Sequence, residues 1–231
     1  EFRRVLFRSE WMGSSAARRD QTLIRINDDS TPWHAEDLAL IRAVGATGVM
    51  LPKCESASQA ASALQGLPAN ATVLPLIETA GGMMALQQIA AAPGVARLAF
   101  GSLDYMADLD IPANSPVLDF SAAQIAIASR AAGIASPVAG VTPELDPSRV
   151  SADMAQARAL GFGAKMCIHP SQVPAVLKAL APSDAEVAWA QRVLQAWAAS
   201  TGGAIQLDGK MVDRPVILKA ERIVARAAQA G

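Results

Sequence analysis

The sequence has 231 residues, of which 52% are hydrophobic and 18% charged, and its formal net charge is −1. This length suffices for one large domain or two small ones with a substantial core. The near-neutral charge, without a basic block, argues against nucleic acid as the main partner. Only two cysteines occur, Cys54 and Cys167, so we expect no disulfide scaffold and a reducing, cytoplasmic setting.

The start of the chain is arginine-rich and has no clear place in a fold. Residues 1–19 lack the continuous apolar core of a signal peptide. A transit-like leader is one explanation, although Glu1 and Glu10 count against it. We interpret residues 1–19 as a non-native, vector- or adapter-derived leader. No later apolar run reaches the roughly 18 residues that a membrane-spanning helix needs, so no membrane partner is expected.

From Gln21 onward, short apolar runs alternate with helical patterns. The runs predicted as strands are residues 22–27, 48–53, 72–78, 97–102, 136–141 and 164–169. The helical patterns between them lie at residues 34–46, 56–67, 81–92, 121–133 and 148–163. Continuous apolar runs are typical of strands buried on both faces, and intervening helices imply parallel pairing. The alternation therefore fits a doubly wound sheet or a (β/α)₈ barrel.

Polar residues near the ends of the predicted strands favour the barrel. They are Arg25, Asn27, Lys53, Glu55, Glu78, Asp104, Thr142, Glu144 and His169. In a barrel these ends converge on one face, whereas in an open sheet only the switch point would matter. No glycine-rich dinucleotide fingerprint follows the first strand. We therefore predict a TIM (β/α)₈-type barrel of which six strands are visible.

The end of the chain no longer alternates strand and helix. A helix is predicted at residues 185–200, a loop at 201–214 and a last amphipathic helix at 215–228, whose Pro215 suits a first helical turn. We predict a leader at residues 1–19, a partial barrel at 20–182 and a C-terminal helical lid at 183–231.

Two carboxylates at predicted strand ends are candidate metal ligands. Glu78 ends a buried run and is followed by glycines, with no adjacent lysine or arginine, and Asp104 follows the next strand. Proteins usually hold Mg²⁺ through one or two carboxylates, with waters and substrate oxygens completing the shell. Roles as helix N-caps or in salt bridges explain both residues equally well. We interpret Asp108 and Asp110 as solvated loop charges.

Two further polar residues of the predicted barrel, Arg25 and His169, have both a functional and a structural explanation. Arg25 lies inside an apolar strand, where an unpaired guanidinium is costly to bury. It either pairs with a structural carboxylate or binds an anion at the barrel mouth. His169 could act as a general base, but its place before a proline at a strand end favours a structural role. No nucleophile elbow or catalytic cysteine motif occurs.

Four segments of the sequence are distinctive when they are taken together, in this order: LPLIETAGGM, LAFGSLDYMADLD, GFGAKMCIHPSQ and LDGKMVDRPVILKAERIVARA. They resemble the citrate lyase beta subunit family of acyl-CoA lyases, which includes the malyl-CoA and citramalyl-CoA lyases. A fifth, IRINDDSTPWHAEDL, is similar to the family's third-strand segment. Jointly these motifs are specific, and the resemblance runs from about Arg19 to the C-terminus.

The resemblance implies a Mg²⁺-dependent barrel enzyme that forms homo-oligomers (trimers or hexamers). Such an enzyme cleaves or forms the C–C bond of a β-hydroxyacyl-CoA, giving a 2-oxo acid and an acyl-CoA. By motif position, Glu78 and Asp104 match the metal ligands, and Arg25 matches an active-site, substrate-binding arginine. Asp213 matches a catalytic aspartate that longer members place over a neighbouring subunit's site. Asp213 could also serve as the N-cap of the last helix.

The sequence departs from the family pattern at its start. The family begins with two further strands that are not found here, so we interpret the chain as a barrel lacking its first two strands, N-terminally truncated. Two alternatives to the acyl-CoA lyase remain. One is a pyruvate-type, metal-dependent aldolase acting on free hydroxy-oxo acids, and the other is a catalytically inert fragment or subunit. The segment GKMVD favours the CoA enzymes, and an acyl-carrier protein could replace free CoA.

Overall fold

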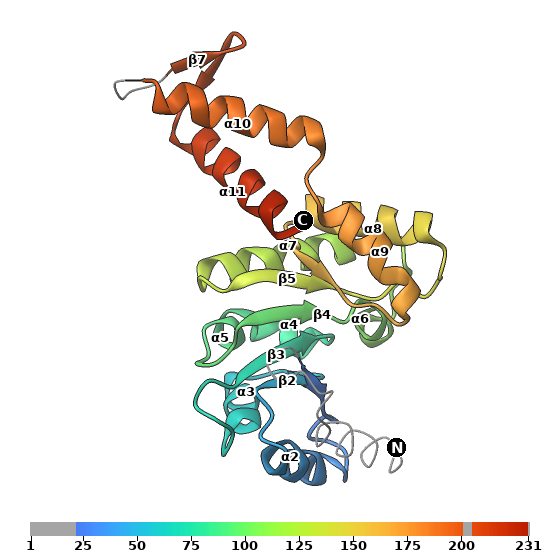
Figure 1. The fold of residues 1–231 in the computed structure, drawn as a ribbon. Helices are drawn as coiled ribbons and strands as arrows, with labels where there is room; N and C mark the ends of the chain where they lie inside the picture. Colours follow the sequence, from blue (N-terminus) through green and yellow to red (C-terminus); the bar gives the residue numbers. More distant parts are fainter. Residues whose placement is uncertain (1–21, 201–204, 231) are drawn as a thin grey trace. The chain divides into compact units, whose positions relative to one another are not determined.

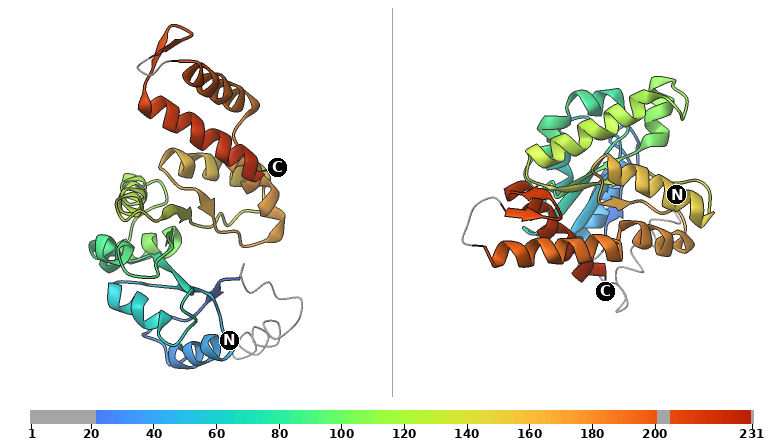
Figure 2. Two further views of the ribbon diagram at one scale, coloured as in Figure 1. Left: turned by 60° about the vertical axis from the view of Figure 1, so that its left-hand side comes forward. Right: turned by 90° about the horizontal axis from the view of Figure 1, so that it is seen from above.

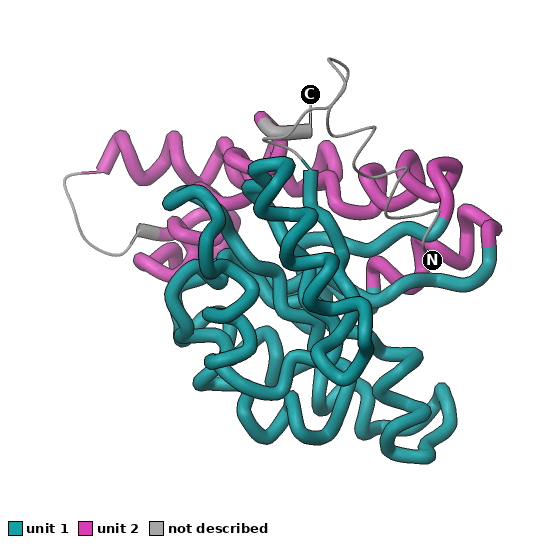
Figure 3. Tube along the Cα trace, turned by 90° about the horizontal axis from the view of Figure 1, so that it is seen from below, with its two compact units in different colours: residues 1–144, 156–168 teal, residues 145–155, 169–231 magenta. Residues whose placement is uncertain are grey.

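The computed structural model describes residues 22–200 and 205–230 (Figures 1 and 2). The chain divides into two compact units, which Figure 3 shows in different colours. The first unit contains Glu1–Glu144 and Gln156–Ile168, and the second contains Leu145–Ala155 and His169–Gly231.

The first unit is built on a six-stranded sheet in which all neighbouring strands are parallel. Its strands are β1 (Ile24–Arg25), β2 (Gly48–Leu51), β3 (Thr72–Ile77), β4 (Arg97–Phe100), β5 (Ala135–Ala139) and β6 (Ala164–Lys165). They lie in the sheet in the same order as in the chain. A doubly wound sheet would reverse its order at a switch point, whereas a barrel would not. The predicted partial TIM-type barrel is therefore confirmed, and its strands end one to four residues earlier than predicted.

Helices connect successive strands of this sheet along the chain. They are α2 (His34–Ala43), α3 (Ala57–Leu64), α4 (Ala80–Met84), α5 (Leu86–Ala90), α6 (Ser102–Leu109), α7 (Pro116–Ala131) and α8 (Pro147–Ala159), the last of which belongs partly to the second unit. Helix α3 packs against β2 and β3, α7 packs against β4 and β5, and α5 contacts both helices. Figures 1 and 2 show α3, α5 and α7 as a layer along one face of the strands.

Two details of the helix prediction were wrong. The segment predicted as one helix at residues 81–92 is interrupted at Ala85, which separates α4 from α5. Helix α6 was predicted as a strand end followed by a loop. It forms because its Tyr105 is buried, with the phenol oxygen 2.9 Å from the hydroxyl oxygen of Ser121 on α7. This tertiary contact anchors a helix too short for its periodicity to be recognised.

The sheet supplies the core of the first unit. Val49, Val73 and Leu98 are fully buried, as expected for parallel strands covered by helices. A separate buried cluster contains Leu74, Leu76, Ala99 and Val138. Leu74 and Leu76 are two residues apart on β3 and therefore share one face of the sheet.

Among its described residues, the second unit contains a 3₁₀ turn, four helical segments and a hairpin. After η2 (Pro170–Gln172) come α9 (Val173–Leu180), α10 (Asp184–Ala198), β7 (Ile205–Leu207), β8 (Lys210–Val212) and α11 (Arg214–Ala230), with the first part of α8 as the fourth helical segment. Helices α10 and α11 share a core in which Val193, Ile217 and Ile223 are buried. A capping box between Ser183 and Glu186 starts α10.

The prediction of a loop at residues 201–214 was wrong for the central part of this segment. Strands β7 and β8 pair there as an antiparallel hairpin. Its turn is Asp208-Gly209, and both residues have positive φ, +50° and +74°. Asp-Gly is a common sequence for such a two-residue turn. The strands have only three residues each, which is too short for an alternating pattern to stand out.

Among the helices in the described ranges, none has the length and apolar character that crossing a membrane requires.

Candidate active site

Three of the four predicted site residues belong to the carboxyl-end region of the sheet in the first unit. Arg25 is the last residue of β1, Glu78 directly follows β3, and Asp104 lies in the first turn of α6, just after β4. Arg25 and Asp104 are exposed, whereas Glu78 is only 2% exposed. The carboxyl ends of neighbouring parallel strands meet at one edge, which is how residues far apart in sequence reach the same place.

The two oxygens of the Glu78 carboxylate have different surroundings. The backbone N–H of Lys53 donates a hydrogen bond of 2.9 Å to Oε1. Oε2 is buried and has no hydrogen-bond partner within the described parts of the chain. A buried carboxylate oxygen without a partner is costly, so this oxygen is where a cation would be stabilising.

The N-cap interpretation of Glu78 is wrong. Thr79 is the N-cap of α4, because its hydroxyl accepts a hydrogen bond of 3.1 Å from the backbone N–H of Gly82. The N-cap of α6 is Gly101, and Asp104 lies in the first turn of that helix. A carboxylate in a first turn interacts favourably with the helix dipole, so Asp104 stabilises α6 by its position, and this does not conflict with a metal role.

The charges around Glu78 act on its ionisation. Burial, followed by repulsion from the Asp104 carboxylate, raises the pKa of Glu78 from 4.5 to about 7, while the N–H of Lys53 and the charge of Arg25 oppose the rise. Asp104 and Arg25 are thus close enough to Glu78 to influence it electrostatically. A buried carboxylate oxygen without a hydrogen-bond partner among the described residues, beside a second carboxylate, fits a hard divalent cation.

A cation at this place would need further ligands. In the described residues, no group of three or more His, Cys, Asp or Glu side chains is arranged to hold a metal ion. Waters or substrate oxygens would therefore complete the shell, and Mg²⁺ is the ion that commonly binds in this way.

The raised pKa gives a prediction for the metal-free protein. Because Glu78 binds its proton more tightly in the folded chain, its stabilising contribution is present below about pH 4.5 and is lost as the pH rises through about 7. The change is on the order of 3 kcal/mol. We expect the free energy of unfolding, measured with urea, to fall between about pH 5 and about pH 8. Glu78→Gln should flatten this fall, and an equal fall in the variant would contradict the assignment.

Residues around the two carboxylates form hydrogen bonds that the sequence did not reveal. The side chain of Asp108 accepts a bond of 2.7 Å from the backbone N–H of Ala80, at the start of α4. Its interpretation as a loop charge was therefore incorrect, since Asp108 lies on α6, one turn after Asp104. The hydroxyl of Thr79 donates to Glu55 Oε1 at 2.6 Å. Recognition of α6 would have identified Asp108, because positions i and i+4 share a helix face.

Both histidines have structural contacts. The His34 Nδ1 lies 2.7 Å from the carbonyl oxygen of Asn27, so this nitrogen must carry the hydrogen. The His169 Nδ1 accepts a bond of 3.1 Å from the backbone N–H of Ser171 and caps η2. This agrees with the structural role favoured for His169.

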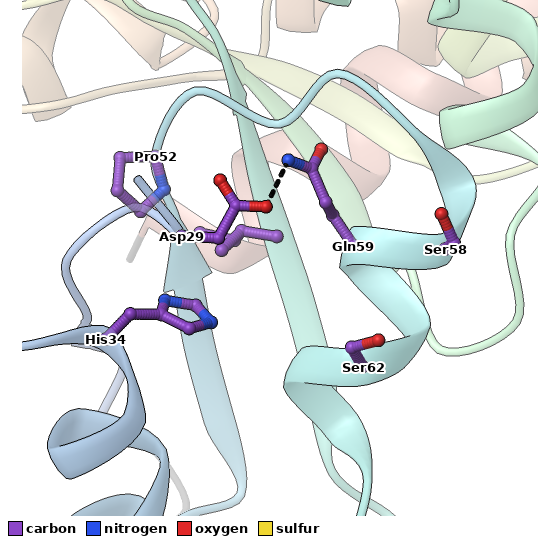
Figure 4. A pocket seen from close by; sticks show the side chains of 7 residues that line it. Asp29, His34, Pro52, Ser58, Gln59 and Ser62 are labelled. Carbon is purple, nitrogen blue, oxygen red and sulfur yellow. Dashed lines mark hydrogen bonds between the residues drawn. The ribbon is translucent and has the colours of Figure 1, made fainter. Parts of the chain in front are cut away.

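A pocket of about 260 Å³ lies between α2 and α3 (Figure 4). It is lined by Asp29, His34, Leu51, Pro52, Ser58, Gln59 and Ser62. The Gln59 side chain donates a hydrogen bond of 2.7 Å to Asp29, drawn as a dashed line in Figure 4. None of the predicted site residues lines this pocket, so the candidate metal ligands form a separate site.

Asp213, the fourth predicted site residue, belongs to the second unit. It is exposed and lies between β8 and α11. Its Oδ1 accepts a hydrogen bond of 3.4 Å from the backbone N–H of Val216. Asp213 therefore does cap the last helix, as the structural alternative proposed, and a catalytic role would come in addition.

Comparison with known proteins places these features in a family context. The HpcH/HpaI aldolase/citrate lyase family matches residues 11–170. A citrate lyase subunit beta-like protein from Deinococcus radiodurans is 34% identical over 223 residues, which cover 93% of this chain and 78% of the relative.

Two solved structures show how far the similarity extends. CitE from Mycobacterium tuberculosis, in complex with magnesium, acetoacetate and coenzyme A, aligns with a TM-score of 0.82 at 34% identity, over 93% of this chain and 80% of that one. A citrate lyase from Burkholderia xenovorans LB400 aligns with a TM-score of 0.88 at 27% identity, over 99% and 79%.

Proposed function

Because the chain belongs to the HpcH/HpaI aldolase/citrate lyase family, we propose that it is a Mg²⁺-dependent acyl-CoA lyase. It would cleave or form the C–C bond of a β-hydroxyacyl-CoA of the malyl-, citramalyl- or citryl-CoA type, giving a 2-oxo acid and an acyl-CoA. The observation that carries this proposal is the buried Oε2 of Glu78, which has no hydrogen-bond partner among the described residues and lies near the charges of Asp104 and Arg25. The CitE structure with magnesium, acetoacetate and coenzyme A supports it.

The proposed metal ligands are Glu78 and Asp104. Their carboxylates supply the negative charge, and Glu78 presents Oε2 because Oε1 is already bonded to the Lys53 N–H. When bound, Mg²⁺ supplies Lewis acidity toward the oxygens of the 2-oxo acid. Carboxylates with waters and substrate oxygens suit this ion.

The proposed reaction divides the remaining work between Arg25 and Asp213. Cleavage breaks the C–C bond between the hydroxyl-bearing carbon and the carbon next to the thioester. The hydroxyl-bearing carbon becomes the carbonyl carbon of the 2-oxo acid as its hydroxyl proton is released to solvent, and the bonding electrons form a thioester enolate. The Arg25 guanidinium would stabilise the developing oxyanion. A protonated Asp213 would donate a proton to the enolate carbon, and its carboxylate would remove that proton in the condensation direction.

A substrate panel tests the proposal. We expect the purified chain with Mg²⁺ to release a 2-oxo acid from malyl-, citramalyl- or citryl-CoA, and EDTA to abolish the release. Turnover only of a free hydroxy-oxo acid would support the aldolase alternative. Turnover only of acyl-carrier-protein esters would show that an acyl-carrier protein, and not CoA, carries the acyl group. Failure on every substrate with Mg²⁺ present would favour the inert fragment.

A further inference from the structure

We propose that Gly101 and the backbone of Lys53 are positioning residues for the Glu78 carboxylate. Lys53 binds Oε1 and Gly101 leaves room for Oε2, so that a single oxygen faces the cation. This inference rests on the proposed function, because it concerns the orientation of a proposed metal ligand.

Gly101 lies in contact with the carboxylate. A Cβ atom at this position would lie 2.4 Å from Glu78 Oε2 and 2.6 Å from Glu78 Cβ, which are distances that non-bonded atoms do not tolerate. The backbone of Gly101 has φ −86° and ψ 67°, a conformation open to residues with a side chain. Glycine is therefore required here by the close approach of Glu78, not by the backbone conformation.

The position of Gly101 is fixed by the sheet. Its N–H donates a hydrogen bond of 2.9 Å to the carbonyl oxygen of Ile77, the residue before Glu78. Pairing of β3 with β4 thus brings the glycine and the carboxylate together. A side chain at residue 101 would push the carboxylate away or separate the two strands, and both outcomes would disturb Oε2.

Lys53 contacts the other oxygen through its backbone. Its φ is +44°, which is uncommon for a residue with a side chain. The other described non-glycine residues with positive φ are Asp110, at the end of α6, and Asp208, in the hairpin turn. Lys53 is in neither setting, and its N–H is bonded to Glu78 Oε1. Unusual backbone geometry retained beside a candidate site indicates a functional constraint.

The side chain of Lys53 has a smaller part in this arrangement. It is 53% exposed, and its ammonium lies 3.9 Å from the Asp28 carboxylate, a long separation at which a solvated ammonium contributes little. The following N–H, that of Cys54, bonds to the carbonyl oxygen of Leu76 on β3 at 3.3 Å. Backbone contacts therefore tie the segment after β2 to β3, and they aim the Lys53 N–H at Glu78.

Metal affinity of the whole chain tests the role of Gly101. Mn²⁺ binding, followed by electron paramagnetic resonance and competed with Mg²⁺, should be weakened about 10- to 100-fold by Gly101→Ala, the usual range for residues that orient a ligand. The matched control is Gly163→Ala, whose added Cβ would lie 2.9 Å from Ser136 Cβ, near the opposite ends of the strands. We expect this control to keep the affinity of the unsubstituted chain.

Variants of Lys53 provide a second test of the inference. This test decides the matter if circular dichroism shows that Gly101→Ala does not fold. Lys53→Gly keeps the N–H and adopts positive φ easily, whereas the β-branched side chain in Lys53→Ile opposes it. We expect Lys53→Gly to bind Mn²⁺ more tightly than Lys53→Ile, and equal affinities would overturn the inference.

The Glu78→Gln variant separates the two proposals. If this variant binds Mn²⁺ as well as the unsubstituted chain does, the proposed metal site fails, and the inference fails with it. If Glu78→Gln loses binding but a folded Gly101→Ala keeps it, the inference alone is wrong.

Discussion

Replacing Glu78 with glutamine is expected to lower metal-dependent C–C bond cleavage at least about a thousandfold, because a Lewis-acid metal supplies several kcal/mol of transition-state stabilisation. The amide has nearly the same shape as the carboxylate, so the Lys53 N–H can still donate to its oxygen. What the variant loses is the negative charge that would hold the cation. Steady-state cleavage of the best CoA ester, measured over a range of Mg²⁺ concentrations, checks this prediction.

The same substitution should stabilise the metal-free protein near neutral pH. Glu78 is 2% exposed, and its ionised form has a buried oxygen without a partner in the described residues. A neutral amide avoids the cost of burying that charge. Functional sites often retain residues that reduce stability, and Glu78 fits this behaviour.

Thermal unfolding with and without Mg²⁺ separates the two effects. Mg²⁺ should raise the melting temperature of the unsubstituted chain, because a ligand that binds only the folded state stabilises it, and it should not do so for Glu78→Gln. The matched control is Glu36→Gln, the same chemical change at an exposed position of α2. Undiminished activity of Glu78→Gln would disprove its assignment as a metal ligand.

The features predicted from sequence are those with a local pattern. The strand sequences are continuous apolar runs, and the helical patterns between these runs predicted that the strands pair in parallel. Once a barrel was inferred, convergence of strand ends placed Glu78 and Asp104 near each other although they are 26 positions apart in the chain. The hairpin turn at Asp208-Gly209 had a recognisable sequence, but strands of three residues left no alternation to detect.

The parts of the candidate site that could not be predicted depend on the folded backbone. The Lys53 N–H bonds to Glu78, which lies 25 positions further along the sequence. The orientation of this N–H toward Glu78 depends on the positive φ of Lys53, which the sequence does not show. Gly101 looks like any glycine before a helix until the distance to Glu78 is known. Such contacts arise from the pairing of β2, β3 and β4, and no residue pattern within one segment encodes them.

Replacing Asp213 with asparagine should lower turnover strongly while changing metal affinity little. We propose that this residue transfers a proton to and from carbon, which an amide cannot do. Asparagine is as good an N-cap as aspartate, so the bond from the Val216 N–H to residue 213 should survive. Asp213→Ala loses both functions and should also cost about 1 kcal/mol of stability.

The pair of variants distinguishes catalysis from capping. If Asp213 only caps α11, Asp213→Asn should keep its turnover, and only Asp213→Ala should be impaired. If Asp213 transfers the proton, both variants should lose turnover alike, and Mn²⁺ affinity should remain in both. A fully active Asp213→Asn enzyme would exclude the catalytic role.

Mixing variants tests whether Asp213 acts on the site of a neighbouring subunit. Asp213 belongs to the second unit, whereas Arg25, Glu78 and Asp104 belong to the first, and we propose that residues 183–231 form a lid shared between subunits of a homo-oligomer. In a closed ring, each site would combine the Glu78 of one subunit with the Asp213 of the next. When Glu78→Gln and Asp213→Asn chains mix randomly and in equal amounts, roughly a quarter of these sites contain both unsubstituted residues. Co-refolded mixed oligomers, verified by mass spectrometry, should recover a corresponding share of activity. If the lid serves its own subunit, every site contains one defect, and mixing should restore nothing.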